Sequence, residues 1–92
     1  MIPAIFREVL GRVGIVVRDQ QIESVDILQF RESRGWEVRY DSFTSQFQRA
    51  GITGNHRLSK SIDGITGATM SVAAVKRSAE LALYLHDIVM RS

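Results

Sequence analysis

The chain has 92 residues, 45% of them hydrophobic and 24% charged, and twelve basic against ten acidic side chains give a net charge of +2. This composition is typical of one small globular domain, here residues 1–92 with a core over about 12–90, and a charge so near zero does not indicate a nucleic-acid partner. The absence of cysteine excludes disulfides and thiolate metal sites, and no stretch has the roughly 18 apolar residues that a membrane-spanning helix needs.

The first third of the chain predicts a β-hairpin. Residues Ile5–Leu10 follow the single proline, Pro3, and are expected to form a short helix or an irregular lead-in. Arg12–Arg18 is short, apolar and β-branched, which is typical of a strand. A polar turn at Asp19–Gln21 then leads to a second strand, Ile22–Phe30, and the simplest pairing of the two is an antiparallel hairpin.

The second of these strands carries apolar side chains on both of its faces. One face holds Ile22, Leu28 and Phe30, and the other holds Val25 and Ile27. Because successive side chains of a strand point to opposite faces, this pattern predicts a sheet that is covered on both sides.

Shorter elements are expected between residues 31 and 62. Residues 36–40 alternate in hydrophobicity and predict a third short strand, and residues 58–62 fit a further one. Residues 50–56 have turn chemistry, in which Gly51, Gly54 and Asn55 can take positive φ. A brief helix is expected over residues 42–48, capped by Asp41 or Ser42. Phe43 and Phe47 are four positions apart and would lie on the same face of this helix.

Residues 71–89 predict one long helix. Its helical spacing is kept by Val72, Val75, Ala79, Ala82, Leu83 and His86, and its apolar face is widened by Ala74, Leu81, Leu85 and Ile88. His86 has no second ligand at metal spacing, so a hydrogen-bonded histidine of this face is expected. The predicted fold is α+β, a small antiparallel sheet (the hairpin plus one or two short strands) packed against the long C-terminal helix.

The segment DGITGATMS, residues 63–71, places small and hydroxyl-bearing residues directly before this helix. Its small residues are Gly64, Gly67 and Ala68, and its hydroxyls are those of Thr66, Thr69 and Ser71. Such a run is most often a glycine turn and a helix N-cap. It also suits a phosphate, because the first helical turn offers unpaired N–H groups and the positive end of the helix dipole. Asp63 can orient a hydroxyl or a metal, and Lys60 is close enough in sequence to supply a counter-charge.

The run Asp63–Thr69 resembles the flavinylation motif of FMN-binding domains, which occur in the sodium-translocating NADH:quinone reductase, in the Rnf electron-transport complex and in NosR-type regulators. That motif is an aspartate, two variable positions, Ser or Thr, Gly or Ala, then Ala-Thr, and every position is met. In the family, a magnesium-dependent flavin transferase moves FMN from FAD onto the threonine hydroxyl through a phosphoester. The resemblance implies FMN attachment at Thr69 and cofactor contacts from Asp63, Gly64, Ile65, Thr66, Gly67, Ala68 and Ser71.

An upstream segment is also similar to the family. FRESRGWEVR (Phe30–Arg39) resembles its glutamate-Ser/Thr-x-glycine corner, and SQFQ (residues 45–48) resembles the segment that follows, so the likeness covers about residues 13–85. The turn at residues 19–21 departs from the family, in which glycine is usual there. The resemblance implies that the isoalloxazine lies against this corner, with Trp36 or Phe30 as its apolar wall. The corner residues implied in cofactor binding are Glu32, Ser33, Gly35 and Trp36.

The resemblance implies an electron-transfer domain that carries FMN and is not an autonomous enzyme. Its expected partners are the flavin transferase and redox proteins, and its expected location is the extracytoplasmic side of a bacterial membrane, with attachment only through flanking segments or partners. One alternative is a sensory or regulatory module that holds flavin noncovalently or only contacts a partner. Another is a plain interaction domain with an accidental motif.

Overall fold

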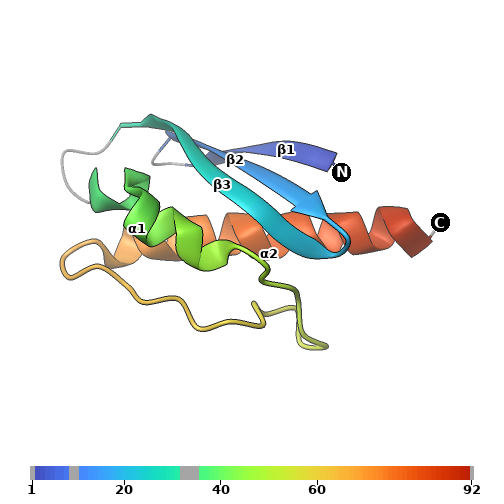
Figure 1. Cartoon of the computed structure of the whole chain (residues 1–92). Helices are drawn as coiled ribbons and strands as arrows, with labels where there is room; N and C mark the ends of the chain where they lie inside the picture. The colour runs from blue at the N-terminus through green and yellow to red at the C-terminus, as the bar shows by residue number, and fades with distance from the viewer. Residues whose placement is uncertain (1, 9–10, 32–35, 92) are drawn as a thin grey trace.

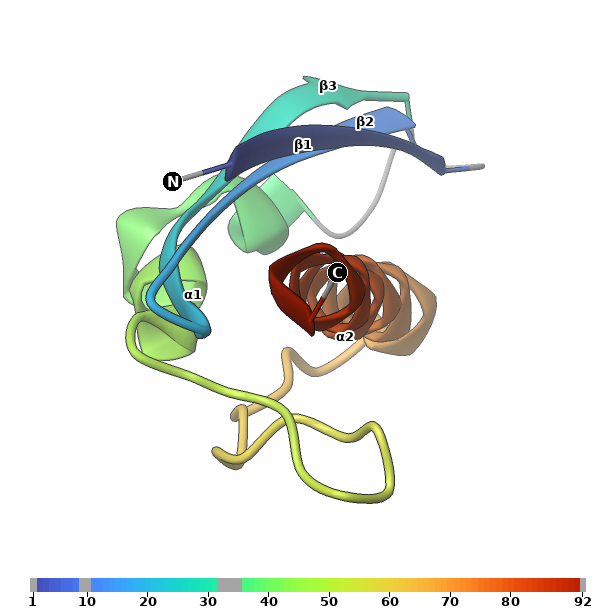
Figure 2. The ribbon, with the colours of Figure 1, turned by 90° about the vertical axis from the view of Figure 1, so that its right-hand side faces the viewer.

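The chain folds as a three-stranded antiparallel sheet packed on one long helix, in a computed structural model that describes residues 2–8, 11–31 and 36–91. The strands are β1 (Ile2–Glu8), β2 (Gly11–Arg18) and β3 (Gln21–Phe30), hydrogen-bonded in that order. The helical elements are η1 (Trp36–Arg39), α1 (Asp41–Thr44), η2 (Ser45–Phe47) and α2 (Thr69–Arg91). The helix α2 runs beneath the sheet, and α1 lies beside α2 (Figures 1 and 2). The predicted α+β class is confirmed.

The predicted hairpin is the pair β2–β3, closed by a two-residue turn. Arg18 pairs with Gln21, and the residues between them, Asp19 and Gln20, have φ of 52° and 66°. Positive φ at both central positions is the geometry of a type I′ turn, which follows the right-handed twist of the strands. The hairpin therefore forms without the glycine that such turns commonly use.

The register of this hairpin shifts twice, between Arg12 and Val13 and between Val16 and Val17. Each shift inserts one extra residue into β3, as a β-bulge does. The result brings the apolar residues of β3 opposite the inward-facing ones of β2, with pairs Val17–Ile22, Ile15–Val25 and Val13–Ile27.

In the described part of the chain, helices cover one face of the sheet only. Ile22 and Val25 are both buried, whereas Leu28 keeps 54% of its surface exposed. Figure 2 shows α1 and α2 on the same side of the sheet. The prediction of a sheet covered on both sides is wrong, because it assumed strict alternation along a strand that carries two extra residues.

The third strand is β1, at the N-terminal end of the chain. It pairs along its length with β2, so the short helix or lead-in predicted from residue 5 is wrong over residues 5–8, and residues 9 and 10 lie outside the described residues. Pro3 is compatible with this position because β1 is an edge strand, where one side of the backbone needs no ladder partner. Residues 36–39 form the 3₁₀ helix η1 in place of the predicted strand, and the predicted strand over residues 58–62 reduces to an isolated bridge between Ile52 and Leu58.

The brief helix predicted after residue 41 is present as α1 and η2. Phe43 and Phe47 are 3% and 0% exposed, and their ring centroids lie 5.5 Å apart in an edge-to-face contact. The predicted cap is wrong, because Tyr40 occupies the N-cap position and makes no side-chain cap hydrogen bond.

The loop after η2 turns at residues other than those predicted. Among the described residues, positive φ occurs here at Arg49 (65°) and His56 (61°), and not at the predicted Gly51, Gly54 and Asn55. The loop is therefore shaped by left-handed conformations at two residues that carry full side chains.

Helix α2 supplies the lower wall of the core. Its buried residues include Val72, Val75, Ala79, Ala82, Leu83 and His86, as the spacing predicts, together with Ser71, Ala74 and Ser78. Leu81, Leu85 and Ile88 are 44–45% exposed, so the wider apolar face is not covered. His86 is only 6% exposed, yet neither ring nitrogen has a hydrogen-bond partner among the described residues, which contradicts the expected hydrogen bonding. No helix in the described ranges is long and apolar enough to cross a membrane.

Candidate functional site

Residues 65–68 of the DGITGATMS segment form a tight turn directly before α2. The N–H of Ala68 donates to the carbonyl of Ile65 at 3.0 Å, and Gly67, third in this turn, has φ of +81°. A positive φ at that position defines a type II turn and favours glycine. The N–H of Val72 then donates to the carbonyl of Ala68 at 3.0 Å, so Ala68 is the N-cap residue. The helix start predicted here is confirmed, and its N-cap residue has no side-chain oxygen.

The first turn of α2 has the properties that a phosphate requires. The N–H groups of Thr69, Met70 and Ser71 have no intrahelical acceptor, because the first such bond comes from Val72. Thr69 is exposed, and a Cβ placed on Gly64 or Gly67 would meet no atom within 4 Å. An open surface therefore surrounds an exposed hydroxyl at the positive end of a 23-residue helix. This arrangement fits an esterified phosphate.

The predicted site residues divide between the surface and the core. Asp63, Gly64, Thr66, Gly67 and Thr69 are exposed. The remaining three turn inward: Ile65 is half-buried, and Ala68 and Ser71 are each 5% exposed. Ser71 lines a narrow gap between α2, η1 and the sheet, so its hydroxyl does not join the open surface.

Asp63 is held from across the chain by Gln46. The N–H of Asp63 donates to Gln46 Oε1 at 2.7 Å, and Gln46 Nε2 donates to the carbonyl of Asp63 at 3.2 Å. The two residues border a hollow of about 320 Å³ whose other lining residues are Glu37, Ser42, Phe43, Gly64 and Ile65. Gln46 was not predicted as a site residue, and its only signal was its place in the SQFQ segment.

The upstream corner is described in part. Glu32, Ser33 and Gly35 lie outside the described residues. Trp36 is 45% exposed, and its ring lies edge-on to Phe30 with 5.5 Å between centroids. The guanidinium of Arg39 stacks over the same indole, 4.8 Å from the ring centroid. The two aromatic residues expected to form the wall are therefore in contact, and sequence reasoning missed the arginine beside them.

Lys60 does not supply a charge to the motif in this conformation. Its Nζ donates to the carbonyl of Gln48 at 2.9 Å, which ties the loop to the end of η2. Arg39 on η1 places a basic charge beside Trp36, and Glu37 of the same short helix borders the hollow beside Asp63.

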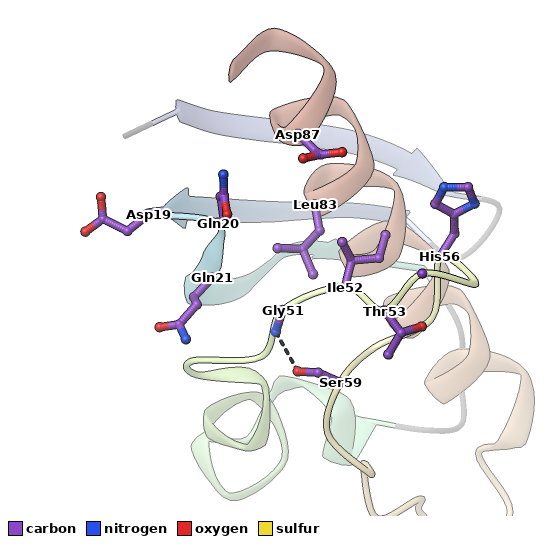
Figure 3. A pocket seen from close by; sticks show the side chains of 11 residues that line it. Asp19, Gln20, Gln21, Gly51, Ile52, Thr53, His56, Ser59, Leu83 and Asp87 are labelled. Carbon is purple, nitrogen blue, oxygen red and sulfur yellow. Dashed lines mark hydrogen bonds between the residues drawn. The ribbon is translucent and has the colours of Figure 1, made fainter. Parts of the chain in front are cut away.

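A wider hollow, of about 480 Å³, is lined by residues from other parts of the chain (Figure 3). It is bordered by the β2–β3 turn, the loop at residues 51–59, and Leu83 and Asp87 of α2. Leu83 follows Thr69 by 14 residues, which is about 21 Å along a helix. No residue of the motif lines this hollow. The motif is taken as the site because it has the hydroxyl, the unpaired N–H groups and the space.

Fold and site define a small α+β domain whose main helix begins at a surface suited to a phosphate-bearing ligand. A family model described as FMN-binding domain matches residues 8–84. No curated protein and no solved structure matches the chain. The family match covers most of the sequence and includes the whole motif, so the chain belongs to the FMN-binding domain family and its cofactor is FMN.

Proposed function

We propose that this domain carries FMN esterified to Thr69 and transfers electrons between redox partners. The observation that carries the proposal is the position of Thr69, an exposed hydroxyl on the first residue of α2 within a complete flavinylation motif. When bound, FMN supplies the redox chemistry, and the protein holds it and sets its surroundings. A covalent link prevents loss of the cofactor to solvent.

The reacting group that this chain supplies to the attachment is the hydroxyl of Thr69. Thr69 Oγ1 attacks the FMN-side phosphorus of FAD, a new O–P bond forms, and the pyrophosphate bond breaks so that AMP leaves. The hydroxyl proton passes to a base of the flavin transferase, whose magnesium ion balances phosphate charge. The product keeps its phosphate beside the N–H groups of Met70 and Ser71, where the helix dipole favours negative charge by about 0.3–1 kcal/mol.

The residues around Thr69 have separate roles in this proposal. Gly64 and Gly67 leave room for the phosphate and the chain that follows it. The Trp36–Phe30 pair offers an aromatic surface for the flavin ring, and Arg39 places a positive charge beside it. The domain would act outside the cytoplasm beside a bacterial membrane, held there by flanking segments or partners, as the family resemblance implies.

The test is co-expression with the flavin transferase, denaturation, and measurement of the intact mass. We expect yellow protein with one FMN-sized increment for wild type and for Ser61→Ala, and no increment for Thr69→Ala. Ser61 is a matched control because it also carries an exposed hydroxyl and lies just outside the motif, two residues before Asp63. An unmodified wild type would contradict the covalent link, and flavin released on its denaturation would then support noncovalent binding. An increment that survives Thr69→Ala would place the attachment elsewhere.

A further inference from the structure

Gln46 holds the backbone of the motif loop with both polar atoms of its side-chain amide. Oε1 accepts from the N–H of Asp63 at 2.7 Å, and Nε2 donates to the carbonyl of the same residue at 3.2 Å. The partners are 17 positions apart in the chain. A residue that both donates to and accepts from one neighbour is bound as in a hydrogen-bonded pair of an antiparallel sheet. We refer to these two bonds as the Gln46 clamp.

The motif loop has few other polar anchors near Asp63. On one side, the N–H of Ser59 donates to the carbonyl of Gly51 at 2.9 Å, and on the other the Ile65–Ala68 turn begins. Within the described part of the chain, no other hydrogen bond reaches the backbone of residues 60–64. Ile62 and Ile65 pack partly against the core on either side. The clamp is therefore the main polar restraint on the first residue of the motif.

We propose that Gln46 is a positioning residue for flavinylation. By fixing Asp63, it holds the loop in the conformation in which the hydroxyl of Thr69 can enter the active site of the transferase. This role rests on the proposed covalent attachment at Thr69. Gln46 makes its hydrogen bonds to Asp63 and none to Thr69, so it acts through the loop and not on the reacting oxygen.

Loss of the clamp has a distinct kinetic consequence. A loop released at Asp63 spends less time in the competent conformation. The apparent affinity of the transferase for the domain then falls in proportion to the fraction of domain molecules whose loop is competent. The rate within the assembled complex stays the same, because the reacting group is unchanged. The variant should therefore raise KM for the domain and leave kcat unaltered.

The variants are Gln46→Met, which keeps the length of the side chain and removes the amide, and Gln48→Met as the control. Gln48 is exposed, lies two positions away, and its side chain makes no hydrogen bond to the described residues. Hydrogen exchange of the Asp63 amide and transferase kinetics with purified domain are measured together. In Gln46→Met, we expect exchange of the Asp63 amide to rise about five- to thirtyfold, as for the loss of one or two net hydrogen bonds. KM should rise by up to the same factor, in inverse proportion to the fraction of the domain that keeps the competent loop. Gln48→Met should match wild type in both.

The outcomes separate this role from the attachment itself. A Gln46→Met domain that is modified with the wild-type KM would overturn the positioning role while leaving the attachment at Thr69 intact. A parallel loss of kcat, α2 amide protection and thermal stability would overturn it in favour of a general structural role. A wild-type domain that takes no flavin would overturn the attachment and the role of Gln46 in it, whereas exchange at Asp63 would still report the clamp.

Discussion

The N–H of Ala68 bonds to the carbonyl oxygen of Ile65 at 3.0 Å, and this one bond fixes where α2 begins. The turn that it closes requires the left-handed conformation of Gly67, with φ of +81°. Thr69 follows two residues later as the first residue of the helix. The orientation of the hydroxyl relative to the helix dipole therefore depends on the conformation of one glycine.

Replacement of Gly67 should destabilise the domain. We expect Gly67→Ala to lower the free energy of unfolding by about 1–2 kcal/mol, because a Cβ in the left-handed region crowds the following carbonyl. Gly64→Ala is the matched control: Gly64 has no positive φ and no atom near its Cβ position, and its effect should stay within about 0.5 kcal/mol. Urea unfolding of the two variants measures the difference, and equal losses would contradict the turn assignment.

His86 should be a site at which an apolar residue stabilises the fold. Its ring is buried with both nitrogens lacking partners among the described residues, and an unsatisfied buried polar group costs about 1–3 kcal/mol. His86→Leu should raise the free energy of unfolding by an amount in that range. His56→Leu, at an exposed histidine edge-on to Tyr84, should change it little. A clear loss of stability in His86→Leu would show that the imidazole makes a favourable interaction.

Glu80 should anchor the long loop to α2. Its Oε2 accepts from the N–H of Leu58 at 3.1 Å, and the carboxylate is partly buried. Glu80→Ala should lower the free energy of unfolding by about 1–3 kcal/mol, because it leaves that N–H without its acceptor. Glu80→Gln keeps an acceptor oxygen and should recover most of the loss. Faster exchange of the Leu58 amide in Glu80→Ala alone would confirm the cause, and unchanged exchange would refute it.

Trp36 should quench the emission of the attached flavin. Electron transfer from an indole to an excited flavin requires near contact, and Trp36, 45% exposed and in contact with Phe30, belongs to the aromatic surface proposed for the ring. Trp36→Leu should therefore brighten flavin emission several-fold in the loaded protein. Tyr84→Leu changes a half-exposed aromatic residue far along α2 and should leave emission unchanged. Equal emission from both variants and wild type would place the ring elsewhere.

Strong periodicity explains which parts of the fold could be predicted from the sequence. The buried face of α2 and the β2–β3 hairpin follow from helical spacing and from β-branched runs, and both are confirmed. The bulges of β3 could not be predicted, because an inserted residue changes the face of its neighbours without any change in composition. The strand β1 was missed because Pro3 disfavours most strands and is acceptable at a sheet edge, which is a tertiary property.

The candidate site could be predicted where local chemistry decides it. The glycine turn and the helix start are encoded within residues 63–71, and the structure confirms them. The burial of Ser71 depends on which side of α2 meets the sheet, and the Gln46 clamp joins segments 17 positions apart. The stacking of Arg39 on Trp36 depends on η1 being helical, whereas alternation had predicted a strand.

The attachment of FMN to Thr69 is tested most directly by peptide mapping of the loaded protein. Trypsin cleaves after Lys60 and Lys76 and releases residues 61–76 as one peptide, which holds every hydroxyl of the motif. Fragmentation of this peptide should place one FMN phosphoester on Thr69, with Thr66 and Ser71 unmodified. A flavin-loaded protein whose 61–76 peptide is unmodified, or is modified at Thr66 or Ser71, would contradict the proposal.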